Sequence, residues 1–371
     1  MSICVFNRDL CFAIIWLEVL KMNQPNPFTL SFGKEPKEYI RRTAEYHEII
    51  GDFEKENPAS CVYIITGVRG SGKTVLLSSL YKYFDEAEKC IAVDLNTNTN
   101  MLEDLAAALY DKAPIKHRFL KGEFSFSFSG LSISLKGENP VTSISQLLEK
   151  MLTALKAKGM KVIVTVDDVD TGTQMKAFVK EFQSLFRKDL PILLVVTGLF
   201  STVGTLEKQE GLTFLQRGKR LYLGPLNIRY IASSYKDIFR LDDGKALQLA
   251  LLTKGYAFGY QALGYLLFEK GASQVDEDIL RNYDYYLEEY VYRRVYNDLP
   301  EKEKAILRAM AFQGITTNKG LVEARVITNN EIKRYKDKLT KKGICATPNR
   351  GEIVIILPRF AEYIRFVESV Y

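Results

Sequence analysis

The sequence predicts an α/β fold in which a parallel β-sheet is followed by a helical region and a small C-terminal domain. Between residues 61 and 225, short apolar runs alternate with helical patterns, which is typical of a layered domain with a parallel sheet. A glycine-rich turn directly follows the first run. From residue 228 the pattern is helical, and after residue 300 it becomes helices followed by a hairpin.

The composition sets the broad class. A chain of 371 residues exceeds one ordinary domain, and 47% hydrophobic with 26% charged residues is usual for a soluble globular protein. The net charge of +6 permits an anionic partner without requiring one. Five scattered cysteines without C-x-x-C spacing, and only two histidines, indicate neither a disulfide framework nor a zinc site. These features favour a cytoplasmic protein.

Residues 1–24 are predicted to be an N-terminal extension that is dispensable. Its apolar run, CFAIIWLEVL, contains Glu18 and is too short to span a bilayer. No A-x-A cleavage site follows this run, so a signal peptide is not favoured. Met22 is an alternative translation start. No other segment has the length and apolarity of a membrane span, so no membrane partner is expected.

Five apolar runs are predicted as strands of a domain over residues 25–227. They are 61–66, 90–95, 161–168, 192–198 and 220–226. Between the second and third, FSFSFSG and LSISL alternate apolar and polar residues, which predicts a hairpin insertion over 122–137 with its turn near Ser129. The apolar face of this hairpin either packs on the core or serves an interaction.

The rest of the chain is predicted as two further domains. Residues 228–299 form a helical lid, whose tyrosines recur at spacings that favour core packing over base stacking. Residues 300–371 contain a helix ended by Gly314, a shorter helix in LVEARVITN and a third in NNEIKRYKDKLTKKG with Asn330 as its cap. A hairpin turning near Asn349 to Gly351 follows. This order is that of a winged helix-turn-helix.

The glycine-rich turn carries the most specific motif. TGVRGSGKT contains G-x-x-x-x-G-K-[ST] between a strand and a helix, the context that a phosphate-binding P-loop requires. Glycines let backbone amides converge on a phosphate, and the helix adds its free N-terminal amides. Lys73 would reach the β- and γ-phosphates, and the Thr74 hydroxyl would hold Mg²⁺. The expected nucleotide-binding residues are Gly67, Val68, Arg69, Gly70, Ser71, Gly72, Lys73, Thr74 and Val75.

The strand at 161–168 ends in two carboxylates. Asp167 is expected to hold Mg²⁺ and Asp168 to polarise an attacking water, because hydrolysis needs a metal anchor and a positioned water. The alternative is that both residues only cap the helix that begins near Thr171. The P-loop upstream favours the catalytic interpretation, since the two motifs need each other.

Thr197 and Arg217 complete the candidate catalytic set. Thr197 ends the next strand, where it would sense the γ-phosphate or orient water, unless it is an ordinary strand-end threonine. Arg217 precedes the last strand and would stabilise the transferring phosphoryl group, in its own subunit or from a neighbouring one. Lys219 and Arg220 lie nearby, and a solvated basic turn is the alternative. No N-K-x-D element for guanine stands in a suitable place, so ATP is the expected nucleotide.

With these motifs in this order, the chain resembles AAA+/STAND-type P-loop ATPases, in particular the origin-recognition-like branch and related bacterial and archaeal stand-alone ATP-binding proteins. The resemblance runs from about residue 25 to the C-terminus. It implies the AAA+ fold with a lid and a winged helix, and an approach of residues 27–42 to the adenine. Its most specific points are Asn26-Pro27-Phe28-Thr29, Ser31-Phe32-Gly33, the P-loop, Leu223-Gly224-Pro225-Leu226 and Gly255-Tyr256-Ala257-Phe258.

The chain departs from this family pattern at two places. Gly255 is present in the lid, but Ala257 stands where a proline is expected and no arginine follows, which weakens the case for a second nucleotide sensor. Asp168 replaces the glutamate typical of AAA+ motors. The shorter side chain retracts the carboxylate from the water, and small misplacements cost rate. Slow hydrolysis, suited to a switch rather than a motor, is therefore expected.

Basic residues gather on the predicted third helix and hairpin of the C-terminal domain. Asn329, Asn330 and Lys333 would face base edges of double-stranded DNA, and Arg350 would enter a minor groove. The cations expected on DNA phosphates are Lys333, Arg334, Lys336, Lys338, Lys341, Lys342 and Arg350. The alternative is a solvated helix that packs on the lid or on a protein partner.

Two functions therefore remain open. The first is an ATP-regulated, DNA-binding ATPase whose nucleotide state controls the display of the lid and winged helix. The second is a signalling or scaffold ATPase whose winged helix and hairpin bind protein partners. Self-association is compatible with both.

Overall fold

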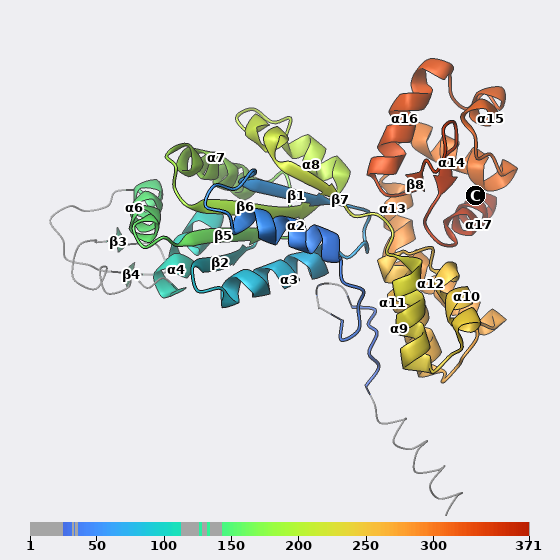
Figure 1. Ribbon diagram of the computed structural model, residues 1–371. Coiled ribbons are helices and arrows are strands. Elements are labelled where there is room, and N and C mark those ends of the chain that lie inside the picture. Colours follow the sequence, from blue (N-terminus) through green and yellow to red (C-terminus); the bar gives the residue numbers. More distant parts are fainter. Residues whose placement is uncertain are drawn as a thin grey trace, which may run out of the picture.

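The computed structural model describes residues 25–31, 33, 36–112, 126–127, 132–133 and 143–370. An α/β domain lies at one end of the molecule, and two mainly helical regions lie at the other (Figure 1). The predicted N-terminal extension, including Met22, falls outside the described residues. In the described part of the chain, no helix has the length and apolar character needed to cross a membrane.

The α/β domain is built on a parallel sheet of order β2-β5-β6-β1-β7. The strands are β1 (Val62–Thr66), β2 (Cys90–Leu95), β5 (Lys161–Val166), β6 (Ile192–Gly198) and β7 (Lys219–Tyr222). The helices are α2 (Thr43–Phe53), α3 (Lys73–Glu86), α4 (Met101–Lys112), α6 (Ile144–Lys156), α7 (Thr173–Arg187) and α8 (Phe200–Leu206). The predicted fold class is confirmed, although β5 and β7 end two and four residues earlier than expected.

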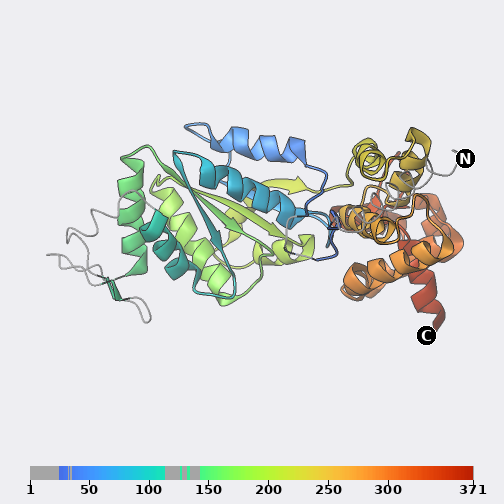
Figure 2. The same ribbon diagram turned by 90° about the horizontal axis from the view of Figure 1, so that it is seen from below.

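Alternation along the strands divides the sheet between two apolar cores. In β1, Tyr63 and Ile65 point to the core shared with α2 and α3, whereas Val62 and Ile64 point to the core under α4, α6 and α7. Successive strand side chains face opposite sides, so a strand buried on both faces reads as a continuous apolar run. Figure 2 shows α2 and α3 together on one side of the sheet.

The hairpin insertion is described only at its two strands. β3 (Phe126–Ser127) pairs antiparallel with β4 (Ser132–Ile133), in agreement with the predicted alternation. The turn near Ser129 lies outside the described residues.

The helical lid follows β7. It comprises α9 (Ile228–Phe239), α10 (Asp243–Leu252), α11 (Ala257–Glu269), α12 (Glu277–Leu287), a π-helical turn (Glu288–Tyr292) and α13 (Arg293–Asn297). The tyrosines Tyr235, Tyr260, Tyr283 and Tyr292 are almost fully buried, which confirms their predicted packing role. Tyr285 and Tyr290 remain exposed.

The C-terminal domain contains helices and a small hairpin. They are α14 (Glu301–Gln313), α15 (Asn318–Glu323), α16 (Asn329–Lys341), β8 (Cys345–Ala346) paired with β9 (Val354–Ile355), and α17 (Phe360–Val370). Two details of the prediction are wrong. Thr328, not Asn330, precedes α16, and its backbone N–H is held by the Glu331 carboxylate at 3.0 Å. The second helix, predicted over residues 321–329, spans Asn318–Glu323. It begins three residues early, because Thr317 caps it by accepting from the Gly320 N–H, and it ends six residues early.

The described residues of the segment before α2 (25–31, 33 and 36–42), here called the strap, contact the lid. The Asn26 side chain donates to the Tyr265 carbonyl at 3.2 Å, and Phe28 is 2% exposed. The Phe28 ring stacks on Phe239 and meets Tyr260 edge-on. The start of the strap is therefore part of the lid core, although it precedes the lid by about two hundred residues of sequence.

We predict that Gly264→Ala destabilises the protein through the strap. A Cβ at Gly264 would lie 2.6 Å from the Phe28 ring, and overpacking of this kind costs about 1–3 kcal/mol. The matched control is Gly51→Ala in α2, where a Cβ would meet nothing within 4 Å. It should be neutral or stabilise by ~0.5–1 kcal/mol. Equal urea midpoints for the two variants would contradict this packing.

Candidate nucleotide-binding site

The P-loop connects the carboxyl end of β1 to the first turn of α3. Gly70 and Gly72 adopt positive φ angles of +73° and +90°, which glycine accepts without strain. Gly67 is required for space, because a Cβ there would lie 2.5 Å from Ser71 Oγ. That hydroxyl is buried and lacks a hydrogen-bond partner among the described residues. An unsatisfied donor inside a curled loop fits a bound phosphate oxygen.

The Lys73 side chain folds back onto the P-loop. Its Nζ donates to the carbonyls of Gly67 at 3.0 Å and Val68 at 3.1 Å. Burial lowers the pKa of Lys73 to about 8, an effect opposed by the nearby carboxylates of Asp168 and Asp167. The ammonium is thus held beside the acidic strand end.

A network of hydroxyls and carboxylates joins the first turn of α3 to the carboxyl ends of β5 and β6. Thr74 Oγ1 donates to Asp167 Oδ2 at 2.7 Å, and Thr197 Oγ1 donates to Asp167 Oδ1. Thr197 also accepts from the Asp168 N–H at 2.9 Å. Asp168 leaves the strand with a positive φ of 48°, and its side chain is exposed. The structure therefore brings together Lys73, Thr74, Asp167, Asp168 and Thr197.

Arg217 lies apart from this cluster. It precedes β7, whose first residue, Lys219, pairs with Tyr63, whereas the P-loop follows Thr66, which pairs with Tyr222. At about 3.3 Å per strand residue, the start of β7 lies ~10 Å from its carboxyl end, which is level with the P-loop, and Arg217 precedes that start by two residues. Arg217 does not reach the site of its own chain, which corrects that part of the prediction. A role from a neighbouring subunit stays a prediction.

The lid and the strap hold the P-loop from outside. Tyr256 Oη donates to the Arg69 carbonyl at 2.6 Å, and the Phe258 N–H donates to the Gly70 carbonyl at 3.0 Å. From the strap, Arg42 Nη2 donates to the carbonyls of Ser71 and Gly224, each at 2.8 Å. Together these contacts fix the P-loop carbonyls of residues 69–71.

The C-terminal domain also touches the P-loop. Val68 is 6% exposed and belongs to the apolar core of the lid and C-terminal domain. Gly343, just after α16, approaches so closely that a Cβ there would lie 3.2 Å from the Val68 nitrogen. The Lys341 Nζ lies 5.8 Å from the ring centre of Phe200 in α8. A displacement of Val68 would therefore change its packing against the C-terminal domain.

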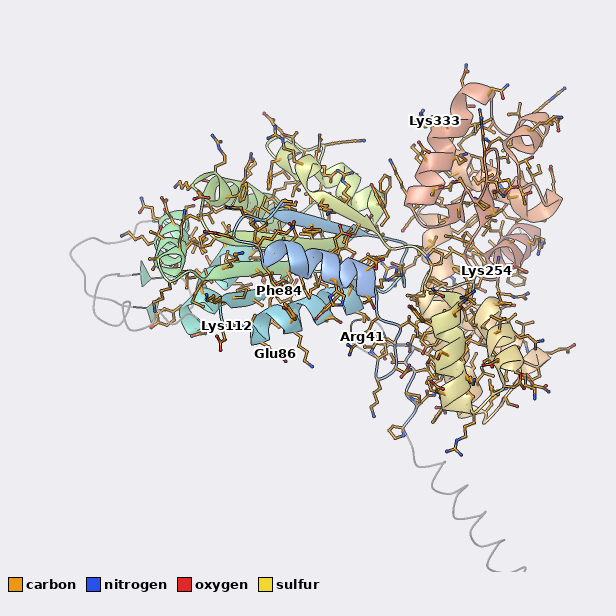
Figure 3. All side chains as sticks on the ribbon, viewed as in Figure 1. Arg41, Phe84, Glu86, Lys112, Lys254 and Lys333 are labelled. Atoms are coloured by element: carbon orange, nitrogen blue, oxygen red, sulfur yellow. The ribbon has the colours of Figure 1, made fainter. Side chains whose placement is uncertain are left out.

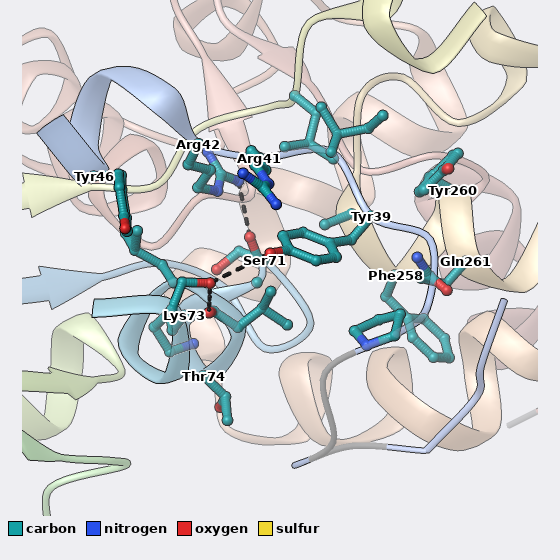
Figure 4. Close-up of a pocket in the computed structure, with 18 of the residues that line it drawn as sticks. Tyr39, Arg41, Arg42, Tyr46, Ser71, Lys73, Thr74, Phe258, Tyr260 and Gln261 are labelled. Carbon is teal, nitrogen blue, oxygen red and sulfur yellow. Dashed lines mark hydrogen bonds between the residues drawn. The ribbon is translucent and has the colours of Figure 1, made fainter. Parts of the chain in front are cut away.

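A cavity of about 520 Å³ opens beside the P-loop, within the usual range for ligand sites. Its walls come from the strap, α2, the P-loop, the outer face of α3 and the lid (Figure 4). Aromatic side chains lining it include Tyr39, Tyr46, Tyr83, Phe258 and Tyr260. The cavity combines apolar walls suited to a base with a phosphate-binding loop at one end.

Sequence reasoning missed the residues that support the site from a distance. Arg42 and Tyr256 lie in segments that carry the family resemblance, but the sequence assigned them no role, because they act through backbone carbonyls. Asp94 in β2 was also missed; it accepts from Thr165 Oγ1 at 2.6 Å, and burial raises its pKa. An acidic residue near the end of an apolar run was the available signal.

Comparisons with known proteins agree with this geometry. Residues 289–364 match a family described as a domain of unknown function (DUF8462), and no curated protein matches the sequence. The fold is similar to the Walker-type ATPase PABY2304 of Pyrococcus abyssi, with a TM-score of 0.56, 16% identity, and coverage of 93% of this chain and 99% of that chain. It is also similar to the ORC2 protein of Aeropyrum pernix in its ADPNP–ADP complexes, with a TM-score of 0.51, 14% identity, and coverage of 92% and 98%.

These likenesses establish the fold. The chain shares the fold of these two structures, with its parallel sheet, helical lid and C-terminal domain in the predicted order. At 14–16% identity they carry no further statement about activity.

We predict that Tyr256→Phe loosens the P-loop. Loss of the hydroxyl leaves the Arg69 carbonyl without this donor, which should cost about 1 kcal/mol of unfolding free energy. Amide hydrogen exchange in residues 67–74 should become faster. The matched control is Tyr283→Phe, because the Tyr283 hydroxyl is buried without a partner among the described residues and its removal should cost nothing. Unchanged exchange in Tyr256→Phe would contradict the proposed support.

Proposed function

We propose that this chain binds ATP with Mg²⁺ and hydrolyses it slowly, as a nucleotide-controlled switch whose C-terminal domain contacts double-stranded DNA. The observation that carries the ATPase part is the convergence of Thr74, Asp167 and Thr197 beside the P-loop. A hydroxyl and a carboxylate oxygen 2.7 Å apart are oxygen donors of the kind Mg²⁺ prefers. When bound, Mg²⁺ neutralises phosphate charge.

The roles of the chain's own groups follow from their positions. Lys73 would exchange its loop carbonyls for phosphate oxygens, and the free Ser71 hydroxyl would donate to another. Thr197 holds Asp167 and the backbone of Asp168 in place. Asp168 would accept the proton of the attacking water. Its side chain is one methylene shorter than glutamate, which supports a slow reaction.

A switch needs a path from nucleotide to partner, and Val68 supplies one. Val68 is part of the P-loop, but its side chain packs in the apolar core of the lid and C-terminal domain. Lys73 donates to the Val68 carbonyl, so its capture by phosphate would alter the same residue. We infer that nucleotide binding changes how the C-terminal domain is held. Arg217 would complete a neighbouring subunit's site in a self-associated state.

The DNA-binding part rests on the exposed end of α16. Asn329, Asn330, Lys333 and Arg334 are exposed, and Lys333 projects from the helix (Figure 3). The other end of the helix faces protein: Lys342 pairs with the buried Glu303 at 2.6 Å, and Lys341 lies over Phe200. The proposed DNA surface is therefore the first half of α16 together with exposed Arg350 in the hairpin turn.

For ATP, we expect Lys73→Ala to abolish nucleotide binding or hydrolysis. Asp168→Ala should retain ATP but hydrolyse it roughly 10²-fold more slowly or worse, the usual contribution of a positioned base. Calorimetry with Mg-ATP and a phosphate-release assay on the full chain measure the two effects. If both variants behave like the parent protein, the active-site assignment is wrong.

For DNA, we expect the double variant Lys333→Ala/Arg334→Ala to bind duplexes of any sequence more weakly. The slope of log affinity against log salt should fall by about 2, because two phosphate contacts are lost. The charge-matched control is Lys89→Ala/Arg187→Ala, whose side chains are exposed on the α/β domain. Fluorescence anisotropy over a range of salt gives both quantities. No binding by the parent protein at low salt would favour the signalling or scaffold function.

A further inference from the structure

The lid offers no positive charge to a bound nucleotide within the described part of the chain. Its residues that line the cavity are Ala257, Phe258, Tyr260 and Gln261. A nucleotide polyphosphate carries several negative charges. Lys73 faces it from the P-loop, and the cavity's other lysine, Lys82, stands nine residues further along α3, ~13 Å away at 1.5 Å per helical residue. A second cation must come from another element if the triphosphate is to be enclosed.

The strap brings two adjacent arginines, Arg41 and Arg42, to the cavity (Figure 4). Arg42 already forms hydrogen bonds to backbone carbonyls. Its side chain is 8% exposed, donates to the carbonyls of Ser71 and Gly224, and lies 3.6 Å from the Glu45 carboxylate. Releasing it would leave buried carbonyls without donors, which is costly. Arg42 therefore supports the P-loop and is not available to a ligand.

Arg41 differs from its neighbour in every one of these respects. It is exposed, it lines the cavity, and it forms no hydrogen bond or ion pair with any residue that the structure describes. Its guanidinium can reorient without breaking a hydrogen bond or an ion pair to a described residue. Arginine presents five N–H donors in a planar fork that matches phosphate oxygens.

The segment that carries Arg41 is fastened to the lid. The Thr29 N–H donates to Gln261 Oε1 at 3.0 Å, and Gln261 Nε2 donates to the Glu38 carbonyl at 2.7 Å. Ser234 in α9 donates to the Glu38 carboxylate at 2.9 Å. Arg41 follows Glu38 by three residues, so its position is set by α9 and α11 as well as by the strap.

We propose that Arg41 binds the polyphosphate chain of the nucleotide in its own subunit. Its guanidinium supplies the positive charge that the described side chains of the lid lack at the cavity. The inference rests on the ATP binding proposed above. It assigns to the strap a phosphate contact that the lid's own side chains do not supply. Because the strap is tied to the lid, phosphate binding by Arg41 would draw the lid and the P-loop together.

The test compares ligands with three, two and no phosphates on the full-length protein. Calorimetry with Mg²⁺ would compare the affinities of the parent and of Arg41→Gln for ATP, ADP and adenosine. A charge-assisted contact to phosphate predicts about a 10- to 100-fold loss for ATP and ADP, with adenosine unchanged. Arg41→Lys should recover part of the loss, since it restores the charge without the fork. Arg187→Gln, an exposed arginine on α7, should change nothing.

Each other outcome decides against the inference in a distinct way. If the parent protein binds ATP and Arg41→Gln binds it equally well, Arg41 is not a phosphate ligand although the proposed function stands. An equal loss for ATP and adenosine would place Arg41 on the base instead. If the parent protein binds no nucleotide, the proposed function fails and this inference fails with it.

Discussion

The P-loop is the point on which the rest of the structure depends. Its carbonyls at residues 69–71 accept hydrogen bonds from Tyr256, Phe258 and Arg42, which belong to the lid and the strap. Its Val68 side chain is packed in the core of the lid and C-terminal domain. The carbonyls and the Val68 side chain of the phosphate-binding loop are thus held by the strap, the lid and the C-terminal domain.

The two aspartates after β5 are likewise held by hydrogen bonds from other segments. Thr197 uses one hydroxyl to hold the Asp167 carboxylate and the Asp168 N–H. Thr74 binds the second oxygen of Asp167. The cluster comes from the start of α3, the residues after β5 and the end of β6. Parallel strands bring their carboxyl ends to the same side of the sheet. The arrangement explains why three separated sequence segments act as one site.

Local patterns were sufficient for the α/β domain, because buried strands and amphipathic helices leave strong signals. They failed where a boundary depends on a single polar contact. The start of α16 is fixed by Thr328 and Glu331 rather than by Asn330, and α15 begins early because of Thr317. The helix α17 was not predicted, although Phe360 and Ile364 are fully buried. Supporting residues such as Arg42 bind carbonyls, which every residue possesses, so sequence gives no sign of them.

The sequence by itself determined the fold class, the phosphate-binding loop and the candidates Lys73, Thr74, Asp167, Asp168 and Thr197, because each is marked by a local pattern at the end of a strand. Only the tertiary structure decided that Arg217 lies at the amino ends of the strands, away from the carboxyl ends that carry the P-loop. It also decided that the two arginines of the strap differ in their availability. Such distinctions arise from residues about two hundred positions apart in the chain. Their contacts form only when the strap, the lid and the sheet are packed together.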